Sequence, residues 1–272
     1  MFEEPYRWVE AVGNRRQYLD EQFQQGSPVV ALSYADGILL LTVSRGTPKL
    51  YEIYDRIALG GMGHPADLEK LRFNLLEMAH VEGFNRSPSD VTGSRMVKYG
   101  LAPVIKQAFE EVYKAPFIVK ILLAELGTKP ERDAFLTINY DGTFEESKGC
   151  AAIASTPMIQ TEVIGSLRKD PGLAAASLGQ AAEAALQAWA IGALAQRAEK
   201  EDTEDRKERS SPSSASSPDA MVIERHLRET LADKTIECAV LERSAPGSSK
   251  YRALKLQEIN QLFPKQSLTR LS

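Results

Sequence analysis

The sequence contains few of the side chains that build redox or metal sites: two cysteines and three histidines in 272 residues. Cys150 and Cys238 lie far apart along the chain, and neither belongs to a Cys-x-x-Cys pair. His64, His80 and His226 are scattered, and no two of them have the spacing of metal ligands. We therefore expect no metal site, no disulfide framework and no cofactor.

Long apolar runs and an excess of basic residues are also missing. No apolar stretch approaches the roughly 20 residues of a membrane-spanning helix, because Glu, Lys or Gln interrupts each candidate. Residues 1–10 are acidic and aromatic, without the basic flank and apolar core of a signal peptide. The formal net charge of −4 argues against a broad phosphate-binding surface. We expect a cytoplasmic protein that binds neither membrane nor nucleic acid.

What remains is the composition of a globular protein, with 43% hydrophobic and 26% charged residues. Apolar residues recur at helical spacing in some stretches and form short strand-like runs in others. Asp36-Gly37 and Asp141-Gly142 each follow an apolar run, which is a strong signal for a β-hairpin. In chain order, the expected elements are a helix over 5–25, strands over 29–34 and 38–44, two strands within 49–61, helices over 65–82 and 87–112, strands over 117–126, 135–140 and 150–155, a helix over 164–197, a short helix near 222–231, strands over 235–244 and 250–256, and a helix over 258–263.

Capping residues place the ends of the two helices in the middle of the chain. Pro65 opens the first helix, and Gly83 is expected to end it. Ser87, followed by a proline at the first helical position and an acid at the third, resembles a capping box that opens the second helix. Gly100 and Pro103 must break or kink that second helix.

Composition changes abruptly between residues 199 and 220, where acids, bases and serines leave almost no large apolar residue. Such a segment buries too little apolar surface to offset its ordering entropy, so we expect a disordered insertion. Elsewhere the elements come in groups: strands, two helices, strands, a helix and a last hairpin. Grouped elements indicate an α+β fold in layers, because a parallel α/β sheet would alternate strands with helices.

The order and spacing of several motifs resemble those of 20S proteasome subunits, and among these the α-type subunits of bacteria. The motifs are SPVVALSYADGILLLTV, PKLYEIYDRIALGGMGHPADLEKLR, SDVTGSRM, LLAELG, LTINYDGTFEESKGCAAIA, ECAVLER and KYRALKLQEINQLF. Each is weak alone, but together they span about residues 21–263 apart from the insertion. The resemblance implies a four-layer αββα sandwich, the fold of N-terminal-nucleophile hydrolases, with an extra N-terminal helix.

Under this resemblance the first residues of the chain form a gate over the axial pore of a ring. Phe2, Pro5 and Tyr6 would belong to that gate, although a frayed chain terminus explains them equally well. The domain limits that follow are a gate segment and N-terminal helix at 1–26, a proteasome-type core at 27–198, the insertion at 199–220, the remaining helix, hairpin and closing helix of the core at 221–263, and a tail at 264–272.

The family contains β-type subunits that cut peptides and α-type subunits that do not. The β-type nucleophile is a threonine at the new N-terminus, whose own amine serves as the base. Counted against that pattern, the nucleophile falls at Ser27, the lysine at Lys49 and the carboxylate at about Val43, which carries no charge. We therefore prefer Ser27 as a turn residue and expect no catalytic residue. The alternative is a self-compartmentalising peptidase whose mature chain begins at Ser27.

Lys49 has a specific role under the resemblance. In α-type subunits the lysine at this place lies between neighbouring subunits and accepts the C-terminal carboxylate of an activator, usually a hexameric ATPase unfoldase. Gly63 would line the same pocket, where a missing side chain lets the tail approach. Without the resemblance, Lys49 would be interpreted as a solvated lysine before a strand.

The resemblance also implies partners. Copies of this chain would form a homo-heptameric ring that stacks on rings of β-type proteasome subunits, with contacts through the N-terminal helix and the helix faces of 68–78 and 96–109. The ring would narrow the substrate entrance. A ring-forming scaffold without a protease partner remains a further alternative.

Overall fold

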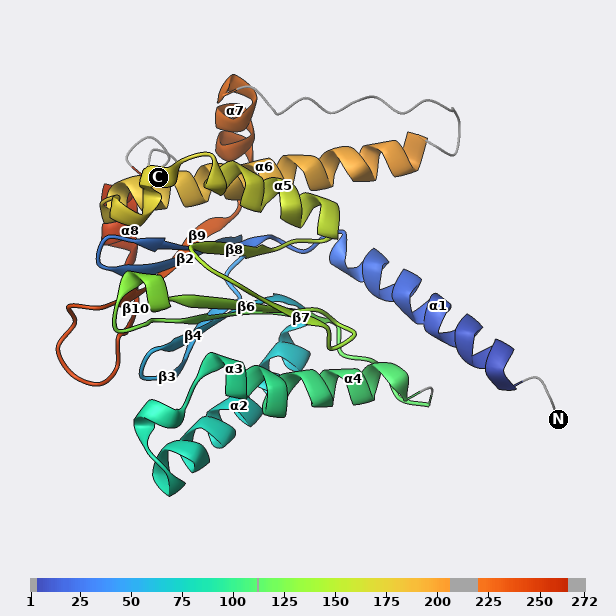
Figure 1. Ribbon diagram of the computed structural model, residues 1–272. Helices are drawn as coiled ribbons and strands as arrows, with labels where there is room; N and C mark the ends of the chain where they lie inside the picture. The colour runs from blue at the N-terminus through green and yellow to red at the C-terminus, as the bar shows by residue number, and fades with distance from the viewer. Residues whose placement is uncertain (1–3, 112, 206–219, 264–272) are drawn as a thin grey trace.

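The computed structural model describes residues 4–111, 113–205 and 220–263 of the chain. Two five-stranded antiparallel sheets lie face to face, and helices cover the outer face of each sheet (Figure 1). This is the four-layer αββα sandwich expected from the sequence. Helix α1 (Glu4–Phe23) projects from one end of the sandwich.

The first sheet has the strand order β10-β9-β2-β1-β8. In β1 and β2, alternate side chains face the upper helices and the second sheet, so both faces of these strands are apolar. Every residue of the two strands is buried. The predicted hairpin is present, but its turn lies at Ala35-Asp36, one residue before the expected Asp36-Gly37, and Gly37 is the first residue of β2, paired with Tyr34. The strands are β1 (Val29–Tyr34), β2 (Gly37–Ser44), β8 (Cys150–Ile153), β9 (Thr235–Glu242) and β10 (Tyr251–Ala253).

The second sheet has the order β3-β4-β5-β6-β7, in which every strand pairs with its neighbours in sequence. Its strands are β3 (Leu50–Tyr54), β4 (Ile57–Gly63), β5 (Val119–Glu125), β6 (Ala134–Ile138) and β7 (Phe144–Ser147). The long connection between β4 and β5 supplies the helices of the lower layer in Figure 1: α2 (Pro65–Asn85), α3 (Gly93–Arg95) and α4 (Ala102–Glu110).

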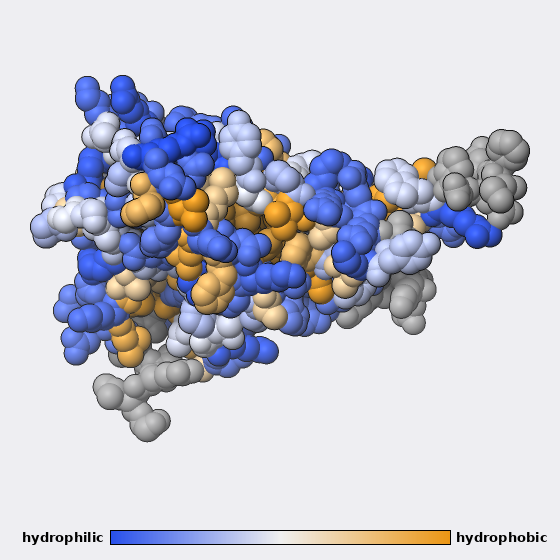
Figure 2. Space-filling model, turned by 90° about the horizontal axis from the view of Figure 1, so that it is seen from below, coloured by the Kyte–Doolittle hydropathy of each residue, from blue (hydrophilic) through white to orange (hydrophobic). Residues whose placement is uncertain are grey.

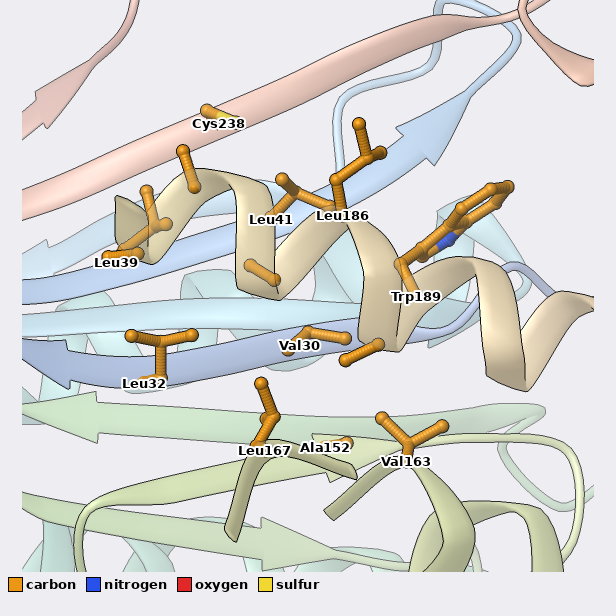
Figure 3. Close-up of a cluster of buried hydrophobic side chains, with 14 of the residues drawn as sticks. Val30, Leu32, Leu39, Leu41, Ala152, Val163, Leu167, Leu186, Trp189 and Cys238 are labelled. Carbon is orange, nitrogen blue, oxygen red and sulfur yellow. The ribbon is translucent and has the colours of Figure 1, made fainter. Parts of the chain in front are cut away.

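The upper helical layer packs on the first sheet through a large apolar cluster (Figure 3). It consists of α5 (Pro157–Arg168), α6 (Leu178–Asp205), α7 (Ala220–Thr230) and α8 (Leu256–Leu262). Val30 and Leu41 of the sheet face Val163 of α5 and Trp189 of α6, and all four are fully or almost fully buried. Each such side chain contributes about 1.5–3 kcal/mol by leaving water, which makes this cluster a main source of stability.

Two expected helix ends in the lower layer are wrong. Gly83 does not end α2, which continues to Asn85; a Cβ at Gly83 would lie 2.2 Å from the hydroxyl oxygen of Tyr54, so close packing explains this glycine. Ser87 caps only a short 3-10 turn, and the next helix begins at Gly93. The break expected at Gly100 takes the form of a π-helical turn over Met96–Leu101.

The single helix expected over residues 164–197 is also wrong, because the structure contains two helices there. Helix α5 begins at Pro157, where the Thr156 hydroxyl caps it, and Pro171 lies in the turn that separates α5 from α6. Helix α6 continues to Asp205, beyond the expected start of the insertion, and an i,i+4 ion pair between Arg197 and Glu201 supports this extension. The rest of the expected insertion up to residue 219 lies outside the described residues.

Candidate functional site

Lys49 and Gly63 line the same cavity of about 480 Å³. Its walls come from the turn between α1 and β1, the loop between β2 and β3, the end of β4 with the start of α2, and side chains of α6 and the loop before β9. Ser27 and Val43, the positions that the sequence comparison with β-type subunits selects, line it as well. The fold therefore brings these four separated residues to one end of the sandwich.

Lys49 is held in place through its backbone. The carboxylate of Glu237, on β9, accepts the N–H of Lys49 at 3.0 and 3.1 Å and the N–H of Leu50 at 2.9 Å. Burial lowers the pKa of the Lys49 ammonium; the Glu237 carboxylate opposes this shift and the Lys234 ammonium adds to it. Glu237 thus joins the two sheets at the cavity and places a negative charge behind Lys49.

Gly63 is required by the backbone of the fold. It adopts a φ of 131°, which favours glycine, and a Cβ there would lie 2.0 Å from the carbonyl oxygen of Ile118. The next residue, His64, donates its backbone N–H to the same oxygen at 2.7 Å. The close approach of β4 to the start of β5 therefore explains this glycine without reference to any ligand.

Ser27 takes part in a hydrogen-bond network at the turn before β1. Its hydroxyl oxygen accepts the indole N–H of Trp189 at 3.0 Å and lies 3.5 Å from the Thr42 hydroxyl. The Gln196 side chain donates to the carbonyl oxygen of Gly26 at 2.8 Å. Val43, at the place where β-type subunits need a carboxylate, is fully buried in the cluster under α6. In this arrangement Ser27 connects the turn to α6.

The expected gate residues lie at the start of α1. Phe2 falls outside the described residues, whereas Pro5 and Tyr6 belong to the first turns of α1, which begins at Glu4. The helix therefore extends into the segment that the sequence assigns to the gate.

Arg15 fixes the middle of α1 to the end of α4. Its guanidinium donates to the carbonyl oxygens of Ala108 at 3.1 Å, Phe109 at 3.0 Å, Glu111 at 2.7 Å and Lys114 at 2.6 Å. Carbonyl groups at a helix C-terminus have no partner within the helix and carry partial negative charge, so a guanidinium is well matched to them.

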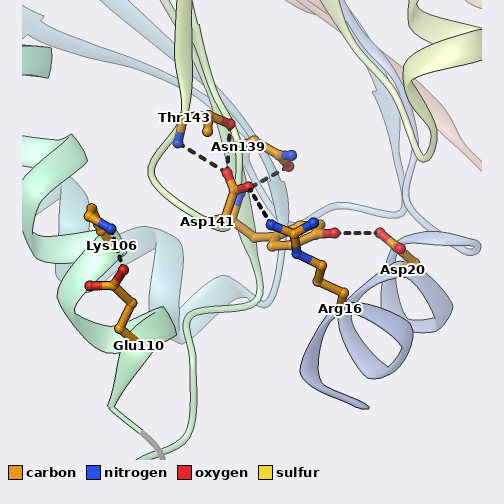
Figure 4. A network of polar contacts seen from close by, with 8 residues as sticks. Arg16, Asp20, Lys106, Glu110, Asn139, Asp141 and Thr143 are labelled. Carbon is orange, nitrogen blue, oxygen red and sulfur yellow. Dashed lines mark hydrogen bonds and ion pairs between the residues drawn. The ribbon is translucent and has the colours of Figure 1, made fainter. Parts of the chain in front are cut away.

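A polar network holds the C-terminal half of α1 (Figure 4). The Tyr140 hydroxyl donates to Asp20 of α1 at 2.9 Å, and Asp141 lies 3.9 Å from Arg16 of the same helix. Beneath the helix, the buried Lys120 ammonium donates to the carbonyl oxygens of Ala154 and Ser155 at 3.0 and 2.7 Å.

Lys120 also lies against the aromatic side chains at the end of α1. Its Nζ is 4.9 Å from the centre of the Phe23 ring, which stacks on Tyr140. Burial lowers the pKa of Lys120 to about 8. The sequence analysis did not identify the buried contacts of Lys120 and Gln196. For Lys120 a signal was present, because a lone lysine inside the apolar run of β5 indicates a buried charge.

The described parts of the chain contain neither a cluster of metal-ligating side chains nor a helix suited to cross a membrane. There, no three His, Cys, Asp or Glu side chains come together as metal ligands. Of the described helices, none combines the length and the apolar composition needed to cross a membrane.

Comparison with known proteins agrees with this architecture. Residues 23–189 match the family model described as "Proteasome subunit". The "Proteasome subunit alpha" of Acidothermus cellulolyticus is 31% identical over 170 residues, which cover 62% of this chain and 70% of that protein. The protein of the same name from Actinosynnema mirum is 35% identical over 135 residues, covering 49% of this chain and 51% of the relative.

A third "Proteasome subunit alpha", from Kineococcus radiotolerans, is 31% identical over 148 residues, covering 53% of this chain and 60% of the relative. The chain thus spans between about half and 70% of the length of these curated relatives. Since the family model covers more than half of the chain and the fold is the expected sandwich, the chain belongs to the proteasome subunit family.

Proposed function

We propose that this chain is a non-catalytic α-type subunit of a bacterial proteasome core particle and acts in the cytoplasm. The observation that carries the proposal is the attachment of α1. Arg15 and the Tyr140–Asp20 contact join this helix to the sandwich, as expected for a helix that is kept. A peptidase that begins at Ser27 would lose the whole of α1 together with these contacts.

The proposed role requires a ring, and two surfaces have the character of subunit contacts. Helix α1 exposes Trp8, Val9 and Tyr18. The lower helical layer, which Figure 2 views from below, shows apolar side chains among charged ones. The exposed apolar side chains of this layer are Phe73, Val81, Phe84, Tyr99 and Val104. Exposed apolar groups of this kind favour protein interfaces, and a head-to-tail contact whose rotation closes gives a ring.

The proposed ring is heptameric, stacks on rings of β-type subunits and narrows the entrance to their chamber. The activator would dock at Lys49, whose partly buried ammonium can pair with a terminal carboxylate. The partner that fits this role is a hexameric ATPase whose tails end in an apolar residue, a tyrosine and any residue. Proteolysis would then take place in the β-type subunits, while this chain controls access.

Mass measurement tests the proposal directly. The protein is expressed alone and together with a β-type subunit, and its mass is measured after denaturation and in the native state. We expect a full-length chain that assembles in multiples of seven and does not cut peptides by itself. A mature chain that begins at Ser27 would overturn the proposal in favour of a peptidase. Rings that do not bind a β-type subunit would support the alternative of a ring-forming scaffold without a protease partner.

A further inference from the structure

Two neighbouring cavities at the Lys49 end of the sandwich are lined by basic side chains. Arg45 and Lys49 line the larger cavity of about 480 Å³, Arg197 lines a second cavity of about 240 Å³, and Lys200 and Lys234 line both. Among the described residues, no Asp or Glu lines either cavity. The two cavities also share the turn before β1, so they lie side by side, and we call them together the basic groove.

This basic groove contrasts with the chain as a whole, which has 37 acidic and 33 basic residues and a net charge of −4. Two of its cations are already paired: Arg45 with Asp233 at 3.2 Å and Arg197 with Glu201 at 3.0 Å. Within the described side chains, Lys49 has no carboxylate within salt-bridge distance. Burial and the nearby Lys234 ammonium both lower the pKa of Lys49, and the Glu237 carboxylate raises it. An anion bound between such cations relieves their repulsion.

The larger cavity also offers apolar contact. The exposed side chains of Pro48 and Pro65 line it, in front of Val43 and Leu68, which are buried. A volume of about 480 Å³ lies within the range of roughly 300–1,000 Å³ typical of pockets for small ligands, so a few residues of an extended peptide fit. The groove therefore combines an apolar wall with two places for negative charge, at Lys49 and at Lys200 with Lys234.

We propose that the basic groove takes a C-terminal tail in which an acidic side chain directly precedes the final apolar residues. The proposal rests on the docking function assigned to Lys49 above. The terminal carboxylate pairs with Lys49, and the acidic side chain lies between Lys200 and Lys234. Residues 264–272 contain Lys265 and Arg270 and no acid, so the charge of this segment does not match the groove.

Labelled peptides test this inference on the full-length protein. The probes are fluorescein-labelled octapeptides of sequence Gly-Ser-Gly-Ser-Xaa-Leu-Tyr-Leu, where Xaa is Glu, Gln or Lys. A fourth peptide carries Glu and an amidated C-terminus. Binding is followed by fluorescence anisotropy at about 50 mM salt, where screening is weak. We expect the Glu peptide to bind about fivefold more tightly than the Gln peptide, and the Lys peptide to bind most weakly of the three.

Variants separate the two sites of negative charge. The double variant Lys200→Gln/Lys234→Gln should remove the difference between the Glu and Gln peptides, whatever common change in affinity the loss of Lys234 beside Lys49 causes for both. Lys49→Gln should instead remove the difference between the free and amidated C-termini. Lys129→Gln, at an exposed lysine beyond the other end of β5, is the matched control and should change nothing.

Each outcome supports or overturns a defined statement. If the free C-terminus matters but Glu, Gln and Lys peptides bind equally, the acidic tail is wrong and docking at Lys49 stands. If the amidated peptide binds as tightly as the free acid, or if no peptide binds, docking at Lys49 is wrong and the inference is overturned with it. A Glu preference that survives the double variant would also overturn it.

Discussion

The carboxylate of Glu237 holds the backbone N–H of Lys49 across the two sheets of the sandwich, at 3.0 and 3.1 Å. These residues lie 188 positions apart in the sequence and on strands, or next to strands, of different sheets. The carboxylate is half-buried, and burial raises its pKa against the effect of the two N–H groups that it accepts. The position of Lys49 therefore depends on a residue near the other end of the chain.

Replacing Glu237 tests this dependence. Glu237→Ala leaves two backbone N–H groups without their acceptor, and we expect the free energy of unfolding to fall by about 2 kcal/mol. Glu237→Gln keeps an acceptor oxygen and should cost less than about 1 kcal/mol. Urea denaturation followed by tryptophan fluorescence measures both. Equal losses would mean that the negative charge, and not the acceptor, stabilises this end of the sandwich.

Lys49→Ala tests the proposed docking of an activator tail at Lys49. Removal of the ammonium deprives a tail carboxylate of its partner, so activator-stimulated degradation should be lost while assembly with β-type subunits is unchanged. Degradation assays with and without the activator, combined with native mass measurement, check both parts. Lys129→Ala, at a lysine remote from the cavity, is the control. Unchanged stimulation in Lys49→Ala would exclude Lys49 from the docking site.

Arg15 should be the main attachment of α1 to the lower helical layer. Arg15→Ala removes donors to four carbonyl oxygens, and we expect a loss of about 2 kcal/mol and faster cleavage of α1 in limited proteolysis. The neighbouring Arg16→Ala is the matched control, because Arg16 is largely exposed and its contact with Asp141 at 3.9 Å should be worth less than about 1 kcal/mol. Similar effects of the two variants would contradict the assignment.

Lys120 should make stability depend on alkaline pH. Burial lowers its pKa from 10.5 to about 8 in the folded protein, so between these values the unfolded chain binds more protons than the folded one. Stability due to this group must then rise with pH. From pH 8 to about 9.5, the free energy of unfolding of the unmodified protein should gain about 1.5 kcal/mol relative to Lys120→Met. Parallel curves for the two proteins would show that Lys120 keeps its ordinary pKa.

Ser27→Ala distinguishes a structural serine from a nucleophile. The indole N–H of Trp189 would lose its acceptor in a nearly fully buried position, and we expect a cost of about 1–2 kcal/mol. Peptide cleavage by the particle assembled with β-type subunits should not change. Loss of cleavage in an assembled Ser27→Ala particle would identify Ser27 as catalytic.

The layers of the fold follow from local patterns in the sequence. The two hairpins and the buried strands β1 and β2 are confirmed, because turn chemistry and apolar runs act over a few residues. The first turn lies one residue before Asp36-Gly37, and the partner strand after Asp141-Gly142 is β7, which the sequence analysis did not predict because its residues are mostly exposed. Predictions that depended on glycine as a helix end were wrong at Gly83, since that glycine accommodates a tyrosine from another element.

The candidate site was predictable only in part. The resemblance to proteasome subunits selects Lys49 and Gly63, which line one cavity. Nothing in the sequence pairs Glu237 with Lys49 or Gln196 with the turn at Gly26, because these contacts join segments 170 or more positions apart. Ile118 approaches position 63 so closely that only glycine fits there, and this approach results from the pairing of β4 with β5, which the sequence does not show.

The clamp of Arg15 on the end of α4 has a consequence for geometry. It joins α1 to the lower helical layer through several hydrogen bonds, so we expect the exposed apolar groups of the two surfaces to keep a nearly constant angle to each other. A ring closes with one number of copies only when each copy turns its neighbour by the same amount. In the proposed ring, the angle between α1 and α4 within one copy would therefore help to set the number of subunits.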